Sequence, residues 1–212
     1  ALLEAVPELE AAAITTPPGP RFGIARDCIE RGLHLLLEKP PCATLGEVEE
    51  LRRLAEARGV TLFTTWHAQH NTGVVAARKL LAEQRIRSMT ILPTPLFVQA
   101  GTLFFPENAH TPIAAELEFA SPAADGPLRA SLDWRKTDGE EWTVEIETGD
   151  GARLRLEGGG ARLLLDGKEV PGEPVHEYPD LYRRFAELID CRESLVDAEP
   201  LRLVADALLV GR

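Results

Sequence analysis

The chain has 212 residues, of which 44% are hydrophobic and 27% are charged, a composition typical of a protein with a packed core. Its 23 basic and 34 acidic residues give a formal net charge of −11 without any Lys/Arg cluster, so we expect no nucleic-acid partner. No apolar run approaches the length of a membrane span, so we expect no membrane partner either. The three cysteines are scattered and form neither a disulfide framework nor a metal-ligand pair, which predicts a protein of the reducing cytoplasm.

The first ninety residues are predicted to repeat a strand, an exit loop and a helix three times. Short apolar runs followed by turn residues predict three strands, over 11–15, 33–37 and 60–65. Apolar spacing predicts three helices, over 21–31, 45–58 and 73–84. Thr44 with Glu47 three residues on is a capping box for the second helix, and Gly59 ends it. This repeat is typical of half of a doubly wound parallel sheet.

After residue 90 the pattern changes to strands joined by tight turns. Seven strands are predicted, over 96–103, 113–119, 128–135, 142–148, 152–157, 162–165 and 169–170. Apolar and charged residues alternate over 143–147, which indicates a sheet with one face in water. Two helices are predicted to follow, one after Pro179 and one over 201–210. The predicted fold class is α/β plus α+β: a Rossmann-like parallel sheet, then a large antiparallel β-sheet domain with helices on one face.

The apolar run 33–37 ends abruptly in Glu38, Lys39 and Pro40. Pro40 cannot donate to a sheet ladder, so the strand must stop there. Ligands of open α/β sheets bind beyond the carboxyl ends of the strands, and the three exits share one rim. The topology therefore predicts that Thr16, Lys39 and His67 gather in one cleft, where Lys39 could transfer a proton. The alternative is an ordinary strand exit with solvated charges.

Other polar residues at the exits also have two interpretations. The loop 15–18 could line a nucleotide site or simply connect a strand to a helix. Trp66 and His67 could offer a flat face and a titratable ring to a cofactor or sugar, or could be a core Trp with a satisfied His. His67 and His70 lie three residues apart, but no carboxylate or Cys completes a ligand set, so no metal is predicted.

Three segments at these exits, 13–18 (AITTPP), 32–40 (GLHLLLEKP) and 66–67 (WH), together resemble the Gfo/Idh/MocA family of NAD(P)-dependent sugar and polyol oxidoreductases. The contexts 64–67 (TTWH) and 201–206 (LRLVAD) resemble members that oxidise an aldose, L-arabinose or D-galactose, at C1 to the aldonolactone. The resemblance implies NAD or NADP as cofactor. It also implies that residues 1–90 are part of a dinucleotide-binding Rossmann domain. Residues 91–212 would then be an antiparallel-sheet domain for substrate binding and oligomerisation, with C-terminal helices.

The resemblance also implies roles for single residues. Lys39 would meet the hydroxyl being oxidised and handle its proton with His67 assisting, so these two are the predicted catalytic residues. The Lys39–Pro40 bond is often cis in the family. Trp142 or Trp134 of the antiparallel sheet could stack on the sugar, and the predicted sugar site is Lys39, His67 and Trp142. The predicted cofactor site comprises Thr15, Thr16, Pro17, Glu38, Lys39, Pro40, Trp66 and His67.

The chain departs from the family's pattern in two places. No G-x-G-x-x-G follows a strand, and we expect the family's N-terminal βαβ unit with its phosphate loop to be missing. Residues 88–91 run straight into 92–95, where members carry an Asp-Pro-Gly-x-Asn-type segment that holds the sugar. We therefore expect an internal segment to be missing at 91–92.

Two interpretations stand beside the enzyme. A non-catalytic regulator that senses a sugar or nucleotide could use the same scaffold, although the presence of both Lys39 and His67 argues against it. The antiparallel sheet could also serve mainly as an oligomer interface, with or without catalysis, because large sheet faces commonly pack against a second subunit. We expect a homodimer or a higher homo-oligomer, with a small sugar as the other partner.

Overall fold

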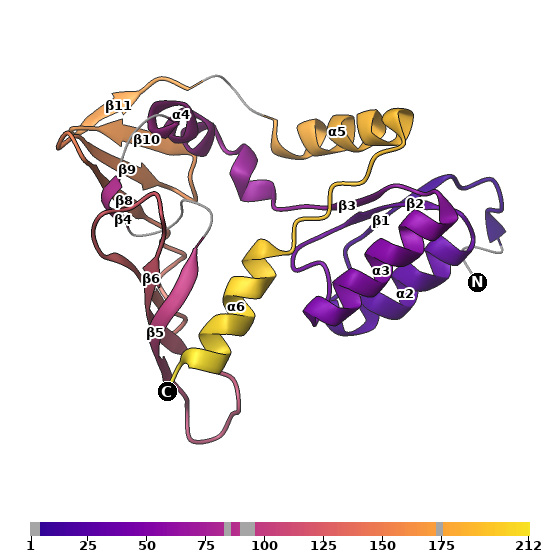
Figure 1. Ribbon diagram of the computed structural model, residues 1–212, viewed down its shortest axis with the longest axis horizontal. Coiled ribbons are helices and arrows are strands. Elements are labelled where there is room, and N and C mark those ends of the chain that lie inside the picture. Colours follow the sequence, from indigo (N-terminus) through magenta and orange to yellow (C-terminus); the bar gives the residue numbers. More distant parts are fainter. Residues whose placement is uncertain (1–4, 83–85, 90–95, 173–175) are drawn as a thin grey trace. The chain divides into compact units, whose positions relative to one another are not determined.

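The computed structural model describes residues 5–82, 86–89, 96–172 and 176–212, with side chains of 86–89 excluded. The chain splits into two compact units, Ala1–His67 with His176–Arg202 and Ala68–Val175 with Leu203–Arg212. Figure 1 shows the elements of both. No helix within the described residues is long and apolar enough to cross a membrane.

The first unit contains a parallel sheet of three strands in the order β1-β2-β3, as predicted. These strands are β1 (Ala11–Ile14), β2 (His34–Leu37) and β3 (Leu62–Thr64). The helices of this unit are α2 (Pro18–Glu30), α3 (Leu45–Arg58) and α5 (Glu177–Cys191). A short 3-10 helix, η1 (His67–His70), follows β3 and was not predicted.

Strand β2 is buried on both faces, as the unbroken apolar run predicted. Leu35 and Leu37 belong to the core that α2 and α3 build on one face. Leu36 points the other way and packs with Phe63 of β3 and Leu181 of α5. Figure 1 accordingly shows α2 and α3 side by side on one face of the sheet and α5 on the other. Burying each such Leu contributes about 1.5–3 kcal/mol, so these two cores fix the sheet between its helices.

The helix caps follow the sequence signals at α3 but not at the C-terminal helices. The Thr44 hydroxyl accepts a hydrogen bond from the Glu47 N–H at 3.2 Å, and the Glu47 carboxylate accepts one from the Thr44 N–H, which completes the capping box. Gly59 ends α3 in the left-handed region at φ 67°. Helix α5 begins at Glu177, however, and not after Pro179. Proline is compatible with a helix's first turn, where N–H groups have no intrahelical partner, so it does not mark the start.

The second unit contains an eight-stranded sheet in the order β11-β10-β9-β8-β4-β7-β6-β5. Its strands are β4 (Ile86–Met89), β5 (Phe97–Phe104), β6 (Ala114–Ala120), β7 (Leu128–Asp133), β8 (Val144–Thr148), β9 (Arg153–Glu157), β10 (Arg162–Leu165) and β11 (Lys168–Val170). Strand β4 was not predicted, and it pairs antiparallel with β8 but parallel with β7. The sheet is therefore mixed rather than purely antiparallel. The four residues of β4 show no alternation that could have announced a strand.

Two helices cover one face of this sheet, α4 (Thr72–Leu81) and the part of α6 (Glu199–Val210) that belongs to the second unit. Helices on one face were predicted, but α4 was expected in the first domain and α5 in this one. Ala77 of α4 packs with Val144 and Ile146 of β8. Ala207 of α6 packs with Ala115 and Leu117 of β6 and with Ala130 of β7. The residues between these inward positions are charged and exposed, which gives the sheet the wet face that its alternation predicted.

The two units do not divide at residue 90 as predicted. Residues from 68 on belong to the second unit, because α4 lies on β9 and β10 and β4 pairs into the large sheet. Helix α5 belongs to the first unit, because its apolar stripe of Leu181, Phe185 and Leu188 packs on β2 and β3. A boundary inferred from a change of pattern misses both, since each assignment depends on long-range packing.

The glycines at 158–160 join β9 to β10 and have a packing role. All three have φ between 59° and 89°, a region that favours glycine. Gly159 accepts a hydrogen bond from the Asn71 side chain at 2.6 Å, and Gly160 accepts one from the N–H of Gly73 at 2.9 Å. A Cβ on Gly160 would lie 2.7 Å from Val74. The loop therefore binds the N-terminus of α4 through hydrogen bonds and is not a phosphate loop.

Gly73→Ala should lower the free energy of unfolding of the second unit by about 1–3 kcal/mol, the usual cost of overpacking. The added Cβ would lie 2.7 Å from the Gly160 oxygen and 2.7 Å from the Arg162 carbonyl carbon. The matched control is Gly23→Ala in α2, where nothing lies within 4 Å, and it should be neutral or stabilising by up to about 1 kcal/mol. Urea unfolding measures both, and equal effects would contradict the close approach at Gly73.

Candidate functional site

The exits of the three parallel strands are joined by hydrogen bonds. The N–H of Glu38 donates to the Ile14 carbonyl at 3.1 Å, which ties the second exit to the end of β1. Thr65 donates its N–H to the Leu37 carbonyl at 2.9 Å and its hydroxyl to the Glu38 carboxylate at 3.4 Å. The topology thus brings together the three segments that begin after Ile14, Leu37 and Thr64, as predicted from the strand order.

Arg21, in the first turns of α2, holds the first two exits together. Its side chain is 2% exposed, and its guanidinium donates to the carbonyls of Thr16, Glu38 and Pro40. Burial lowers the pKa of Arg21 from its ordinary value. Arginine nevertheless keeps its proton at neutral pH, so a full positive charge faces these three carbonyl dipoles. The sequence pattern predicts Arg21 only as the start of a helix and gives no sign of its part in the site.

Lys39 emerges from this anchored loop with an exposed side chain. The Lys39–Pro40 peptide bond is cis, as the resemblance implied. The Glu38 carboxylate accepts from the Lys39 N–H at 2.7 Å and from the Thr65 hydroxyl. Within the described residues, no carboxylate lies at ion-pair distance from the Lys39 ammonium. The cation is therefore presented at the rim without a neutralising partner from this part of the chain.

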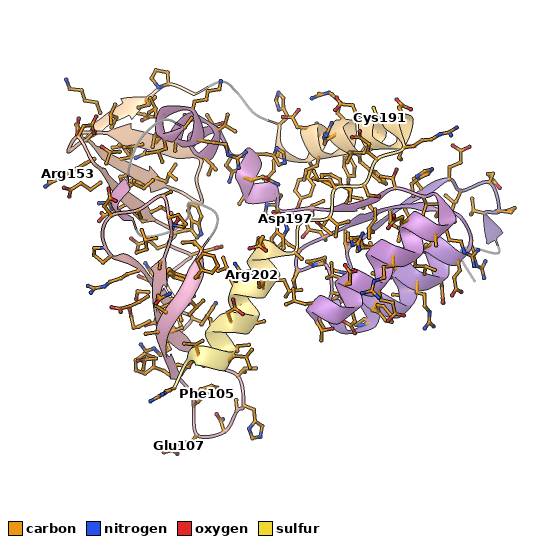
Figure 2. The ribbon with its side chains drawn as sticks, in the orientation of Figure 1. Phe105, Glu107, Arg153, Cys191, Asp197 and Arg202 are labelled. Atoms are coloured by element: carbon orange, nitrogen blue, oxygen red, sulfur yellow. The ribbon has the colours of Figure 1, made fainter. Side chains whose placement is uncertain are left out.

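The third exit is braced by the segment between α5 and α6. The Trp66 indole N–H donates to the Asp197 carbonyl at 2.9 Å. Asp197 in turn donates its N–H to the Thr64 hydroxyl at 2.8 Å, and the Thr64 N–H donates to Leu195 at 3.0 Å. Figure 2 labels Asp197 on this segment. The partly buried Trp66 thus has a structural anchor.

His67 follows at once and contacts the start of α5. Its Nδ1 is hydrogen-bonded to the Glu177 carboxylate. The imidazole also stacks on Tyr178, with ring centroids 6.0 Å apart and planes 23° apart. Sequence reasoning missed Glu177 and Tyr178, because they lie about 110 residues from His67 and no local pattern connects them.

Parts of this rim suit the nicotinamide end of a dinucleotide. The Thr16 hydroxyl is buried and has no hydrogen-bond partner among the described residues, so it is a polar group for a ligand to satisfy. Thr15 and Pro17 on the same loop are exposed. The N-terminus of α2 suits phosphate poorly, because Pro18 and Pro20 remove two of its first three N–H donors.

The predicted tryptophans of the sugar site belong to the second unit. Trp142 is partly buried and packs on the core that includes α4, with its ring 3.3 Å from where a Cβ of Gly160 would lie. Trp134 is 63% exposed. Among the residues that the structure describes, no group of three His, Cys, Asp or Glu is arranged to hold a metal ion.

Comparison with known proteins identifies the class of this chain. Residues 1–66 match the GFO_IDH_MocA model, described as an oxidoreductase family with an NAD-binding Rossmann fold. The chain is 33% identical to a galactose 1-dehydrogenase of Pseudomonas fluorescens over 247 positions, covering 99% of this chain and 80% of that protein. The chain therefore belongs to the Gfo/Idh/MocA family of oxidoreductases, which confirms the resemblance and the dependence on a nicotinamide dinucleotide.

Two solved structures extend the comparison. A D-galactose-1-dehydrogenase from Rhizobium etli has a TM-score of 0.91 and 36% identity, covering 100% of this chain and 79% of its own. The 3-ketoreductase KijD10 from Actinomadura kijaniata, solved with NADP, has a TM-score of 0.79 at 17% identity, covering 99% of this chain and 81% of its own, and shows the fold alone. These matches confirm the predicted fold class.

The alignment with the Pseudomonas enzyme also bears on the predicted missing segment. It spans 247 positions while the chain has 212 residues, so at least 35 positions of the alignment have no residue of this chain. The predicted position of the missing segment, at 91–92, lies outside the described residues.

Arg21→Met should lower the free energy of unfolding of the first unit by about 2–4 kcal/mol, because it leaves three carbonyls of a buried site without their charged donor. Arg26→Met on the same helix is the control. Arg26 is exposed, its ion pair with Asp27 is 3.9 Å long and its guanidinium lies 5.9 Å from the centre of the Phe22 ring, so its loss should cost at most about 1 kcal/mol. Guanidinium chloride unfolding compares them; similar midpoints for the two variants would exclude the anchoring role.

Proposed function

We propose that the protein oxidises an aldose, D-galactose or L-arabinose, at C1 to the aldonolactone, with NAD or NADP as hydride acceptor. The observation that supports this most is the 33–36% identity to two galactose 1-dehydrogenases over nearly the whole chain. The two sugars share their configuration from C2 to C4, so both are candidates. The rim formed by the three strand exits supplies an amine and an imidazole on adjacent loops, which is what this reaction needs.

Lys39 and His67 would handle the proton. The anomeric hydroxyl becomes alkoxide-like as the hydride leaves, so a nearby cation or base lowers the barrier. The exposed Lys39 ammonium, without an ion pair from the described residues, is free to approach that oxygen. His67 would orient the hydroxyl through a hydrogen bond.

The cofactor site would comprise the rim residues of all three exits. Thr15, Thr16 and Pro17 would line the ribose, with the unpaired Thr16 hydroxyl as one donor. Glu38 and Pro40 would hold the loop that carries Lys39, and Trp66 with His67 would lie beside the nicotinamide. When bound, the dinucleotide supplies the hydride acceptor, and the protein supplies alignment.

Lys39→Met in the full-length protein should lower kcat for D-galactose or L-arabinose by a factor of about 10² or more, because the alkoxide-like hydroxyl loses the cation that stabilises it. The Kd of the dinucleotide should change little, since the cofactor contacts come mainly from other residues. Absorbance at 340 nm gives the rates, and fluorescence titration gives the Kd.

Lys168→Met, on the exposed edge strand β11, is the matched control and should retain wild-type rates. Turnover of Lys39→Met within a few-fold of wild type would rule out the role of Lys39. A wild-type protein that binds dinucleotide and sugar without any rise at 340 nm would favour the non-catalytic sensor instead.

We further propose that the face of the large sheet opposite α4 and α6 joins two copies of the chain. Helices α4 and α6 cover the other face. This face is charged: Arg129 pairs with Glu118 at 3.2 Å and Arg155 with Glu145 at 3.2 Å. A shallow hollow of about 530 Å³ lies over these strands. Rows of alternating sign can meet their own copy across a two-fold axis, which supports a homodimer.

Arg129→Glu should convert that dimer into monomer, because it places like charges beside Glu118 on a face that meets itself. Arg53→Glu on α3 of the first unit breaks a comparable pair with Glu49, 2.7 Å long, and should leave the dimer intact. Sedimentation equilibrium measures the mass. A wild-type monomer, or an unchanged dimer in Arg129→Glu, would refute this interface.

A further inference from the structure

The imidazole of His67 is held on its edge and on one of its faces by the first two residues of α5. Glu177 contacts Nδ1, and the Tyr178 ring stacks on the imidazole. The side chains of His67 and Glu177 are 26% and 31% exposed, so their contact is partly shielded from water. The ring is therefore fixed in orientation before any ligand binds.

The contact also determines which ring nitrogen carries the proton. An ionised carboxylate can only accept hydrogen bonds, so in the neutral imidazole the proton must be on Nδ1. Nε2 then has a lone pair and can accept a hydrogen bond or a proton. Carboxylates that orient a working histidine through its other nitrogen are a recurring device in enzymes.

We propose that Glu177 is the positioning residue for His67, and that it keeps Nε2 as the acceptor for the sugar hydroxyl. The identity of that hydroxyl rests on the proposed function, whereas the tautomer of His67 does not. Glu177 needs no contact with the sugar or the dinucleotide to act in this way. Its effect passes entirely through the imidazole.

The charges around the pair act on Tyr178, the residue that stacks on His67. Burial raises the pKa of Tyr178, and the Glu38 and Glu177 carboxylates add to that rise. The phenol therefore stays protonated and neutral. Within the described residues, the charged groups that act on Tyr178 from α5 and from the β2 exit are thus these two carboxylates.

A purely structural explanation is that Glu177 ties α5 to η1 and does nothing else. Glu177→Gln separates the two explanations, because glutamine keeps the shape of the side chain but loses the charge. The Gln amide can accept from Nδ1–H or donate to Nδ1, so it no longer dictates the tautomer. A tie alone would leave His67 and the kinetics unchanged.

Long-range ¹H–¹⁵N spectra of the full-length protein test the tautomer directly. The His67 signals are assigned by their loss in His67→Asn. The wild type should show the Nδ1–H form, and Glu177→Gln should show a mixture with the Nε2–H form. A wild type in the Nε2–H form, or the same spectrum in Glu177→Gln, would overturn the proposal.

Kinetics supply the second readout. Glu177→Gln should lower kcat by about 10-fold or more while the KM for the dinucleotide stays within about 2-fold. In a His67→Asn background the same change should cost less than about 2-fold more, because the effect passes through His67. Equal losses in both backgrounds would contradict that route. Glu187→Gln, on the same helix and paired with Arg184 at 3.1 Å, is the control and should match wild type in both readouts.

The two readouts separate failure of the inference from failure of the proposed function. If neither sugar is oxidised but the spectra change as expected, the aldose dehydrogenase proposal fails and the positioning role stands. If the sugar is oxidised but Glu177→Gln leaves spectra and kcat unchanged, the function stands and the role of Glu177 is lost.

Discussion

The candidate site depends on one buried positive charge. Arg21 joins three backbone carbonyls from two strand exits that would otherwise lack donors at a buried position. Hydrogen bonds to a charged group contribute about 1.5–3 kcal/mol each, against about 0.5–1.5 for neutral ones, so one side chain can outweigh the entropy of ordering two short loops. Lys39 is carried by one of those loops and Thr16 by the other. Arg21 thus fixes the positions of both loops, although it needs no contact with a ligand.

Local signals in the sequence were sufficient for most of the first unit. The run 33–37 could only be a strand buried on both faces, and Pro40 had to end it. The predicted bounds of α3 agree with the structure at both ends, because Thr44 and Glu47 mark its start and Gly59 marks its end. Strand order then followed from the handedness of β-α-β connections, and with it the meeting of the three exits. The resemblance succeeded for the same reason, because its motifs lie on those exits.

What the sequence did not reveal depends on contacts between distant segments. Strand β4 enters the large sheet between β7 and β8, and nothing in its four residues requires this. Helix α5 returns to the first unit after more than 100 residues because Leu181 and Phe185 fit against Phe63. Arg21, Glu177 and Tyr178 belong to the same class: each looks like an ordinary surface residue of an amphipathic helix until the fold brings its partner to it. Of the candidate site, sequence could therefore give the exposed groups but not their supports.

The free energies of two kinds of contact show that core packing positions α5, whereas the contact between Glu177 and His67 acts mainly on the imidazole. Truncating Leu181 or Phe185 would cost about 2–5 kcal/mol each, whereas the partly exposed contact between Glu177 and His67 is worth about 1 kcal/mol of stability or less. Core packing therefore decides where α5 lies, and the carboxylate contributes little to holding it there. A group with so small a share in stability can still decide the protonation state of its neighbour, because only one proton must be placed. The packing of α5 on β2 and β3 thus places the Glu177 carboxylate beside His67, where it acts on the imidazole.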